Sequence, residues 1–224
     1  MNTSQIDRRP IKSRDARWAH GLTDRLVRWG VSANAISVCG MISGIAAGIC
    51  FAFTYVEQLR FVGFLVGALC VQLRLIANML DGMVAIASQT NSPVGELYNE
   101  VPDRVSDTAT LVGCGYAMGG TPLLGYWVTI LAIFLAYIRA TGRVAGSPQY
   151  YIGPMAKQHR MFVVTLFAII SAFLPQQTWF HLSWDPSASW MTIGLMIILV
   201  GECITIYLRL NKIQQYLRSS QQDA

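Results

Sequence analysis

Charged side chains are scarce in this sequence, at 13% of its 224 residues, against about 25% in an ordinary soluble domain. Hydrophobic residues make up 53%, and the mean hydropathy is +0.41. This balance excludes a soluble globular domain. We therefore expect an all-α, polytopic membrane protein.

Cysteines are few and are not arranged in pairs. All five lie inside apolar runs, without the spacing of a disulfide framework or a cysteine metal site, so we interpret them as small core residues. No apolar segment precedes Arg8 and Arg9, and we expect no cleavable signal peptide. The net charge of +5 comes largely from the first 28 residues, which indicates anionic lipid headgroups as partners and no nucleic acid.

Long apolar runs predict six transmembrane helices. A polar, disordered tail is expected over 1–10, an interfacial helix over 11–30, a six-helix transmembrane domain over 31–210, and a polar tail over 211–224. The predicted spans are Ala35–Val56, Phe61–Ser88, Val94–Gly119, Pro122–Ala140, Met161–Leu174 and Trp190–Leu208.

The segment 11–30 alternates basic with apolar positions. Trp18, Leu22 and Leu26 recur every four residues, which predicts an amphipathic helix lying on the membrane surface. The alternative is a basic tail that only sets topology.

Loop charges predict the orientation of the chain. Lysines and arginines gather in the N-terminal segment, between the fourth and fifth spans, and at the C-terminus. The opposite loops carry only Arg60, and 175–189 contains no Lys or Arg. The positive-inside rule therefore predicts that both termini are cytoplasmic, which fits an even number of spans.

The acidic residues are concentrated in one stretch. Five of the 12 lie between 78 and 107, in an otherwise apolar region. A carboxylate near the middle of a membrane costs about 2.5–3.5 kcal/mol on insertion scales, so a compensating positive charge is required, and a divalent metal is a candidate. The five are Asp81, Glu96, Glu100, Asp103 and Asp107.

The stretch has the pattern of two helices joined by a short link. The link, 88–93, is polar and ends in proline, as a tight helix–helix connection does. Counting outward from its middle, Asp81 and Asn99 lie at equal depth, and Asn78 lies level with Asp103. Two antiparallel helices would therefore bring these oxygen-bearing side chains together as one cluster.

The spacing resembles the CDP-alcohol phosphatidyltransferase family over some 26 residues. The family pattern is Asp-x2-Asp-Gly-x2-Ala-Arg-x8-Gly-x3-Asp-x3-Asp. This chain reads Asn78-x2-Asp81-Gly82-x2-Ala85-Ile86-x8-Gly95-x3-Asn99-x3-Asp103.

The resemblance implies an enzyme of phospholipid biosynthesis. It would transfer a phosphatidyl or related phosphoalcohol group from CDP-diacylglycerol or a similar CDP-alcohol to a small alcohol acceptor, releasing CMP. The resemblance also implies Mg²⁺ or Mn²⁺ as cofactor, a homodimer, and a place in the bacterial inner (cytoplasmic) membrane among its lipids. The residues implied in CDP binding are Gly82, Ala85, Gly95, Asn34 and Ser37.

By the same resemblance, Asp81 and Asp103 match a metal ligand and the general base, which also binds metal. Asn78 and Asn99 match metal-binding aspartates but bring no charge, and Ile86 replaces the family arginine. A divergent bacterial branch is similar in carrying Asn at both places with a further downstream Asp, which implies an active variant. The candidates to supply the missing charge are Glu100 and Asp107.

A second polar feature is the segment 153–160. A helix that begins here presents free N–H groups beside two cations, Lys157 and Arg160, which together favour an anion. Similarity to the family's Gly-Pro-x-x-Lys segment implies phosphate contact, with Arg139 and Arg143 as further members of a basic pocket. The alternative is that these charges only set topology.

Two other functions fit parts of the pattern. Carboxylates within a membrane also build the ion pathways of cation- or proton-coupled transporters, although the sequence has no second copy of the acidic hairpin as transporter repeats would require. A non-catalytic member of the family is favoured by Asn78, Asn99 and Ile86. Arg74, inside the second span, needs an anionic partner in either case.

Overall fold

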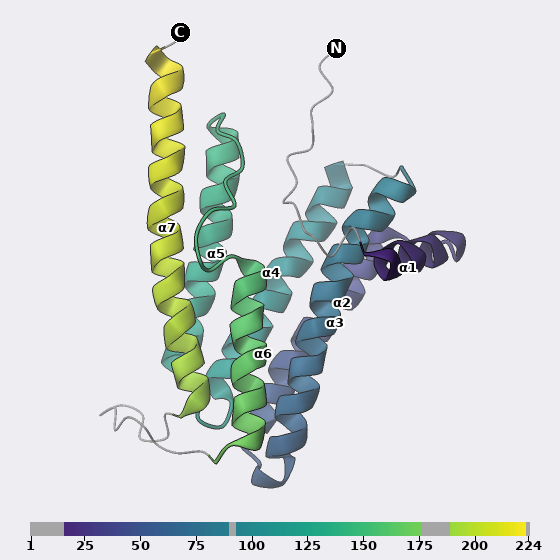
Figure 1. Cartoon of the computed structure of the whole chain (residues 1–224), viewed down its shortest axis with the longest axis vertical. Helices are drawn as coiled ribbons and strands as arrows, with labels where there is room; N and C mark the ends of the chain where they lie inside the picture. Colours follow the sequence, from purple (N-terminus) through teal and green to yellow (C-terminus); the bar gives the residue numbers. More distant parts are fainter. Residues whose placement is uncertain (1–15, 90–92, 176–188, 223–224) are drawn as a thin grey trace.

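The computed structural model describes residues 16–89, 93–175 and 189–222. The N-terminal tail, the link 90–92 and most of the loop 175–189 considered above lie outside these residues. The described part is all helical, with a bundle of long helices and one helix lying across it (Figure 1). The helices are α1 (Arg17–Arg28), α2 (Ala33–Phe53), α3 (Arg60–Ala87), α4 (Pro93–Tyr116), α5 (Pro122–Val144), α6 (Lys157–Phe173) and α7 (Trp190–Gln222), with a short 3₁₀ turn, η2 (Glu57–Leu59).

Four segments of the described chain are long and apolar enough to cross a membrane, which makes this a multi-pass membrane protein. Their outer faces expose apolar side chains, for example Val66, Leu69 and Leu73 on α3, as contact with lipid requires. Of the other two predicted spans, α6 has 17 residues, and α4 carries the acidic residues. The four segments are Ala33–Phe53, Glu57–Ala87, Pro122–Val144 and Trp190–Ser220.

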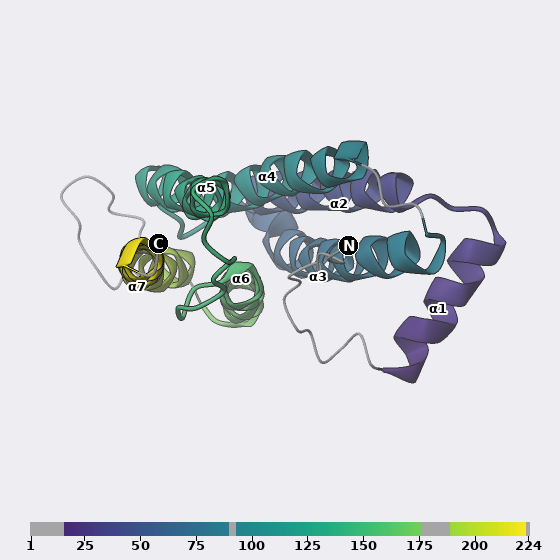
Figure 2. The ribbon, with the colours of Figure 1, turned by 90° about the horizontal axis from the view of Figure 1, so that it is seen from above.

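The amphipathic segment forms α1, which lies crosswise to the bundle and contacts α3 (Figures 1 and 2). Its Ala19 is fully buried, and Leu22 and Leu26 pack with Met79 and Met83 of α3. One face of α1 is thus covered by the protein, while Trp18 and Trp29 remain exposed.

The last helix continues beyond the predicted sixth span. Residues 211–222, predicted as a polar tail, extend α7 as helix to Gln222. At about 1.5 Å per residue, the 33 residues of α7 exceed the roughly 30 Å of a bilayer core. The polar end of α7 is therefore long enough to stand clear of the membrane.

In the ring of helices, α2 packs against both α3 and α4. The sequence predicts that α3 and α4 pack directly side by side, but they contact each other only slightly, because α2 lies against both. Outside this group, α5 packs on α4 and α6 packs on α3, and α7 packs against both α5 and α6 (Figure 2). The ring of helices encloses the polar side chains of α3, α4, α6 and α7.

Glycine allows the close approach of α2 and α4. A Cβ at Gly48 would collide with the carbonyl oxygen of Ala109, and one at Gly113 would collide with the backbone of Gly48. Small residues at this spacing let membrane helices touch through their backbones. The Gly44-x3-Gly48 pattern on α2 therefore marks a helix contact, and this contact determines the axial position of α4 relative to α2.

Gly48→Ala is expected to lower the free energy of unfolding by at least about 1–3 kcal/mol, because the added methyl group forces α2 and α4 apart. The measurement is the thermal midpoint of the purified protein in detergent. Gly21→Ala on α1 is the matched control, since a Cβ there meets nothing within 4 Å. Equal midpoints for the two variants would contradict the proposed backbone contact.

Candidate active site

The oxygen-bearing residues of α3 and α4 meet beside the start of α6. Asn78 Nδ2 donates to both oxygens of Asp103, at 3.3 and 3.4 Å. The predicted register, with Asn78 level with Asp103, is thereby confirmed. Lys157, the first residue of α6, donates to Asn78 Oδ1 at 3.0 Å and forms an ion pair with Asp103 Oδ2. Three helices therefore supply one cluster of a carboxylate, an amide and an ammonium group.

Asp81 lies one turn further along α3 and is 4% exposed. The hydroxyl of Ser37 on α2 donates to its Oδ2 at 2.8 Å, and the backbone N–H of Gly82 donates to Oδ1 at 2.6 Å. Among the residues that the structure describes, no lysine or arginine forms an ion pair with Asp81. Neutral donors therefore orient this carboxylate, and its charge is left for a further cation.

A second layer of charges lies deeper in the bundle and is almost completely buried. Arg74 Nη2 binds Asp107 Oδ1 at 2.6 Å, and Arg160 Nη2 binds Asp107 Oδ2 at 2.7 Å. Arg160 Nη1 then binds Glu202 Oε1 at 2.9 Å, with side chains between 0 and 3% exposed. One chain of ion pairs therefore connects α3, α4, α6 and α7.

Arg74 joins the two layers. Its Nη2 also lies 3.2 Å from Asp103 Oδ1, and its Nε donates to Ser106 at 2.8 Å. Asp103 is thus held by Arg74 from one side and Lys157 from the other. Because both partners are cations, their charge-assisted hydrogen bonds hold the carboxylate of Asp103 in position and stabilise its ionised form.

The charges of the two layers nearly balance. Arg74, Lys157 and Arg160 face Asp103, Asp107 and Glu202. In addition, Arg104, which binds Glu100, lies 3.9 Å from Asp103 Oδ2. The sequence left both a metal and intramembrane arginines as candidates for the compensating charge, and the chain's own side chains supply most of the compensation. Asp81 is the carboxylate left over from this balance.

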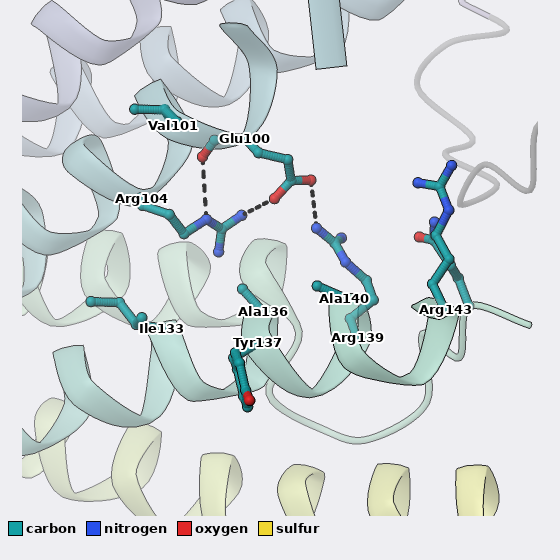
Figure 3. A pocket seen from close by; sticks show the side chains of 10 residues that line it. Glu100, Val101, Arg104, Ile133, Ala136, Tyr137, Arg139, Ala140 and Arg143 are labelled. Carbon is teal, nitrogen blue, oxygen red and sulfur yellow. Dashed lines mark hydrogen bonds and ion pairs between the residues drawn. The ribbon is translucent and has the colours of Figure 1, made fainter. Parts of the chain in front are cut away.

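Glu100 points away from this cluster. It binds Arg104 at 3.2 Å and Arg139 of α5 at 2.5 Å, and it lines a cavity of about 350 Å³ between α4 and α5 together with Arg143 (Figure 3). Arg139 and Arg143 therefore form a basic pocket apart from Lys157.

The structure gathers some of the predicted residues and separates others. Ser37 and Gly82 contact Asp81, as described, whereas Glu100 and Asp107 are engaged by arginines and do not join Asn78. Arg160 is committed to two carboxylates. Within the part of the chain that the structure describes, the predicted members Asn34, Ala85 and Asn99 form no side-chain hydrogen bond or ion pair with these residues.

Glu202 is a residue of the site that the sequence left without a role. It pairs with Arg160 of α6, whereas Arg209, further along its own helix, donates to the backbone of Ile152 at 3.1 Å. The available signal was a lone carboxylate in the apolar run of α7, which requires a partner in a membrane. Which cation it meets depends on how α6 and α7 pack.

The described part of the chain is thus a polytopic helical bundle that holds an acidic and basic cluster between its helices. The fold is similar to that of the Mycobacterium tuberculosis phosphatidylinositol phosphate synthase PgsA1 with CDP-DAG bound. The match covers 88% of this chain and 94% of the synthase chain, with a TM-score of 0.70 and 20% identity. The same synthase in complex with manganese and citrate gives a TM-score of 0.69, at 19% identity and 88% coverage of each chain. The resemblance to the CDP-alcohol phosphatidyltransferase family is thus confirmed in the fold.

Relatives in sequence are distant. The inner membrane protein YnbA of Escherichia coli is 23% identical over 184 residues, or 82% of this chain and 88% of that protein. Cholinephosphotransferase 1 of Gallus gallus is 24% identical over 163 residues, 70% of this chain, and the match spans only 48% of the chicken enzyme's length. No protein-family model matches the chain.

The donor set fits a hard divalent cation. Asn78 Oδ1 and Asp103 Oδ2 already contact one cation, the ammonium of Lys157, and Asp81 adds an uncompensated charge nearby. No three His, Cys, Asp or Glu side chains gather as a metal site within 16–89, 93–175 and 189–222. The amide oxygen of Asn78 is therefore needed to complete an oxygen set, which Mg²⁺ and Mn²⁺ prefer.

Proposed function

We propose that this protein transfers a phosphatidyl or related phosphoalcohol group from a CDP-linked lipid to a small alcohol, with release of CMP. The observation that carries the proposal is the cluster of Asn78, Asp81, Asp103 and Lys157, set at the family spacing within the family fold. CDP-DAG and manganese are bound by the structural neighbour PgsA1, which supports a CDP-linked donor and a divalent metal here.

In the proposed reaction, the acceptor hydroxyl attacks the phosphorus that carries the lipid. The new P–O bond forms as the P–O bond to CMP breaks, and Asp103 takes the hydroxyl proton. Asp81, Asn78 and Asp103 would hold the metal, which neutralises charge on the diphosphate when bound. Lys157, at the start of α6, is placed to contact a phosphate oxygen of the donor.

Lys157 couples binding of the donor phosphate to the contacts of Asp103 in this proposal. Its ammonium lies against Asp103 and Asn78, so an incoming phosphate competes for it with Asp103. Moving toward phosphate would leave Asp103 with Arg74 at 3.2 Å and Arg104 at 3.9 Å. Donor binding would thus make Asp103 a better proton acceptor.

The membrane arrangement is part of the proposal. Helices α2 to α7 would each cross, with α6, about 26 Å long at 1.5 Å per residue, completed by its flanking segments. The cluster lies at the start of α6, and this start points in the same direction as the C-terminal end of α7 (Figure 1). Because the positive-inside rule makes that end cytoplasmic, the cluster would open where CDP-linked substrates are made, in the inner membrane of a bacterium. Homodimerisation is proposed from the resemblance alone.

The direct test is CMP release by the purified protein from CDP-diacylglycerol with Mg²⁺ or Mn²⁺, across glycerol phosphate, inositol phosphate and serine as acceptors. CMP release is expected with one acceptor, and is expected to fall to background with EDTA and return with added metal. Release that is insensitive to EDTA would contradict the role of Asn78 and Asp81 as metal ligands.

A non-catalytic role is the second candidate, because Asn78 and Asn99 carry no charge and Lys157 already serves as a cation for Asp103. Titration of Mn²⁺ followed by electron paramagnetic resonance separates the two. Metal binding without CMP release from any acceptor or CDP-alcohol would favour the non-catalytic role.

A further inference from the structure

Ser106 is an uncharged polar residue that lies between Asp103 and Asp107 along α4, and it is 1% exposed. Its hydroxyl accepts a hydrogen bond from Arg74 Nε at 2.8 Å and donates one to the backbone carbonyl of Asp103 at 3.1 Å. A serine hydroxyl offers one donor and can accept at the same time. Both capacities are therefore used between Arg74 and the residue that we propose as the general base.

The turn of α4 that carries Asp103 lacks part of the usual helix support. Pro102 lies inside α4, directly before Asp103. Proline has no backbone N–H, so the carbonyl four residues earlier loses its helical partner, and the proline ring weakens the helix at this point. The position of Asp103 therefore depends more than usual on contacts with neighbouring groups.

Arg74 supplies such contacts from α3. Its Nη2 lies 3.3 Å from the backbone carbonyl of Asp103 and 3.2 Å from Oδ1 of the same residue. The same nitrogen donates to Asp107 Oδ1 at 2.6 Å. Arg74 therefore holds Asp103 both by its backbone and by its carboxylate, as long as the guanidinium plane keeps its orientation.

Ser106 and Asp107 together fix the plane of this guanidinium group. A planar guanidinium is oriented by contacts at two of its nitrogens, and here Ser106 holds Nε while Asp107 holds Nη2. Without the serine hydroxyl, the short contact with Asp107 remains and the guanidinium can turn about it. The contact with Asp103 Oδ1, which is longer at 3.2 Å, is then the one that weakens.

We infer that Ser106 is a positioning residue, which acts through Arg74 to hold the Asp103 carboxylate in the orientation needed to take the acceptor proton. The inference rests on the proposed function, in which Asp103 is the general base. A displacement of about 1 Å at a reacting group can lower a rate by about 100-fold, so loss of one fixing contact is expected to lower kcat by about tenfold. Because Ser106 acts on the base and leaves Lys157 and Asp81 in place, KM for the CDP-linked lipid is expected to stay unchanged.

Steady-state CMP release by the full-length protein under saturating metal tests this inference, with Ser106→Ala compared with Thr110→Val. Thr110 lies one turn further along α4, is also 1% exposed, and donates its hydroxyl to the carbonyl of Gly44 at 3.1 Å. Each variant loses one buried hydroxyl, so similar decreases in the thermal midpoint are expected. Only Ser106→Ala is expected to lose kcat, by about tenfold. Equal kcat in the two variants would overturn the inference, as would a rise in KM with kcat unchanged.

A second background tests the route through Arg74. Arg74→Lys keeps the charge but lacks the planar fork that reaches Ser106 and Asp103 together, so adding Ser106→Ala to it is expected to lower kcat no further. A further loss of about tenfold in the double variant would show that Ser106 acts independently of Arg74 and would overturn the inference. These outcomes presuppose an active wild type. A wild-type protein that releases no CMP with any acceptor would instead overturn the proposed function, and the inference with it.

Discussion

Asp81→Asn is expected to reduce CMP release by at least about 100-fold, the range found when a single group that stabilises transition-state charge is removed. The substitution keeps the size of the side chain and its capacity to accept from Ser37, but it removes the one carboxylate of the cluster that the described lysines and arginines do not neutralise. The measurement is the initial rate of CMP release from CDP-diacylglycerol under saturating metal.

The matched control is Asp24→Asn, which removes an exposed carboxylate from α1 and is expected to leave the rate unchanged. Mn²⁺ binding should weaken in Asp81→Asn and not in Asp24→Asn, a readout independent of turnover. If Asp81→Asn releases CMP at the wild-type rate, Asp81 does not hold a catalytic metal and the proposed mechanism fails.

Asp107→Asn is expected to destabilise the folded protein by about 3–5 kcal/mol, because removing one partner of a buried ion pair leaves its charge uncompensated. The effect is large here since Asp107 binds two guanidinium groups, Arg74 at 2.6 Å and Arg160 at 2.7 Å, all at most 3% exposed. The measurement is the thermal midpoint in detergent, with Glu57→Gln, an exposed carboxylate in η2, as the control.

A second substitution tests whether the loss of stability comes from the unbalanced charge. In Asp107→Asn, Arg74→Gln, the remaining cations Lys157 and Arg160 pair with Asp103 and Glu202 as before. The double variant is therefore expected to recover most of the lost stability. A double variant that is less stable than Asp107→Asn alone would show that Arg74 stabilises the fold through Ser106 and Asp103 more than through Asp107.

Several features followed from local sequence. Apolar runs of about 20 residues fix where the helices lie, because a buried backbone in a membrane must satisfy its own hydrogen bonds. The equal count of residues on either side of the link placed Asn78 level with Asp103, since helix rise is constant.

The pairing of charges did not follow from the sequence. Arg74 and Glu202 were recognisable as intramembrane charges in need of partners, but nothing local says that Arg74 meets Asp107 or that Glu202 meets Arg160. These choices depend on α2 packing against both α3 and α4, and on α6 and α7 closing the ring. Spacing along the chain carries no information on such contacts between distant segments.

Sequence by itself determined that this is a helical membrane protein with an oxygen-rich cluster at the family spacing. Tertiary structure decided which acids remain available for chemistry. Glu100, Asp103 and Asp107 share one stripe of α4, yet Glu100 meets Arg139, Asp107 meets two arginines, and Asp81 alone keeps neutral partners among the described residues. The physical reason is that the nearest cation in space determines whether the charge of a buried carboxylate is already neutralised, and that cation comes from another helix.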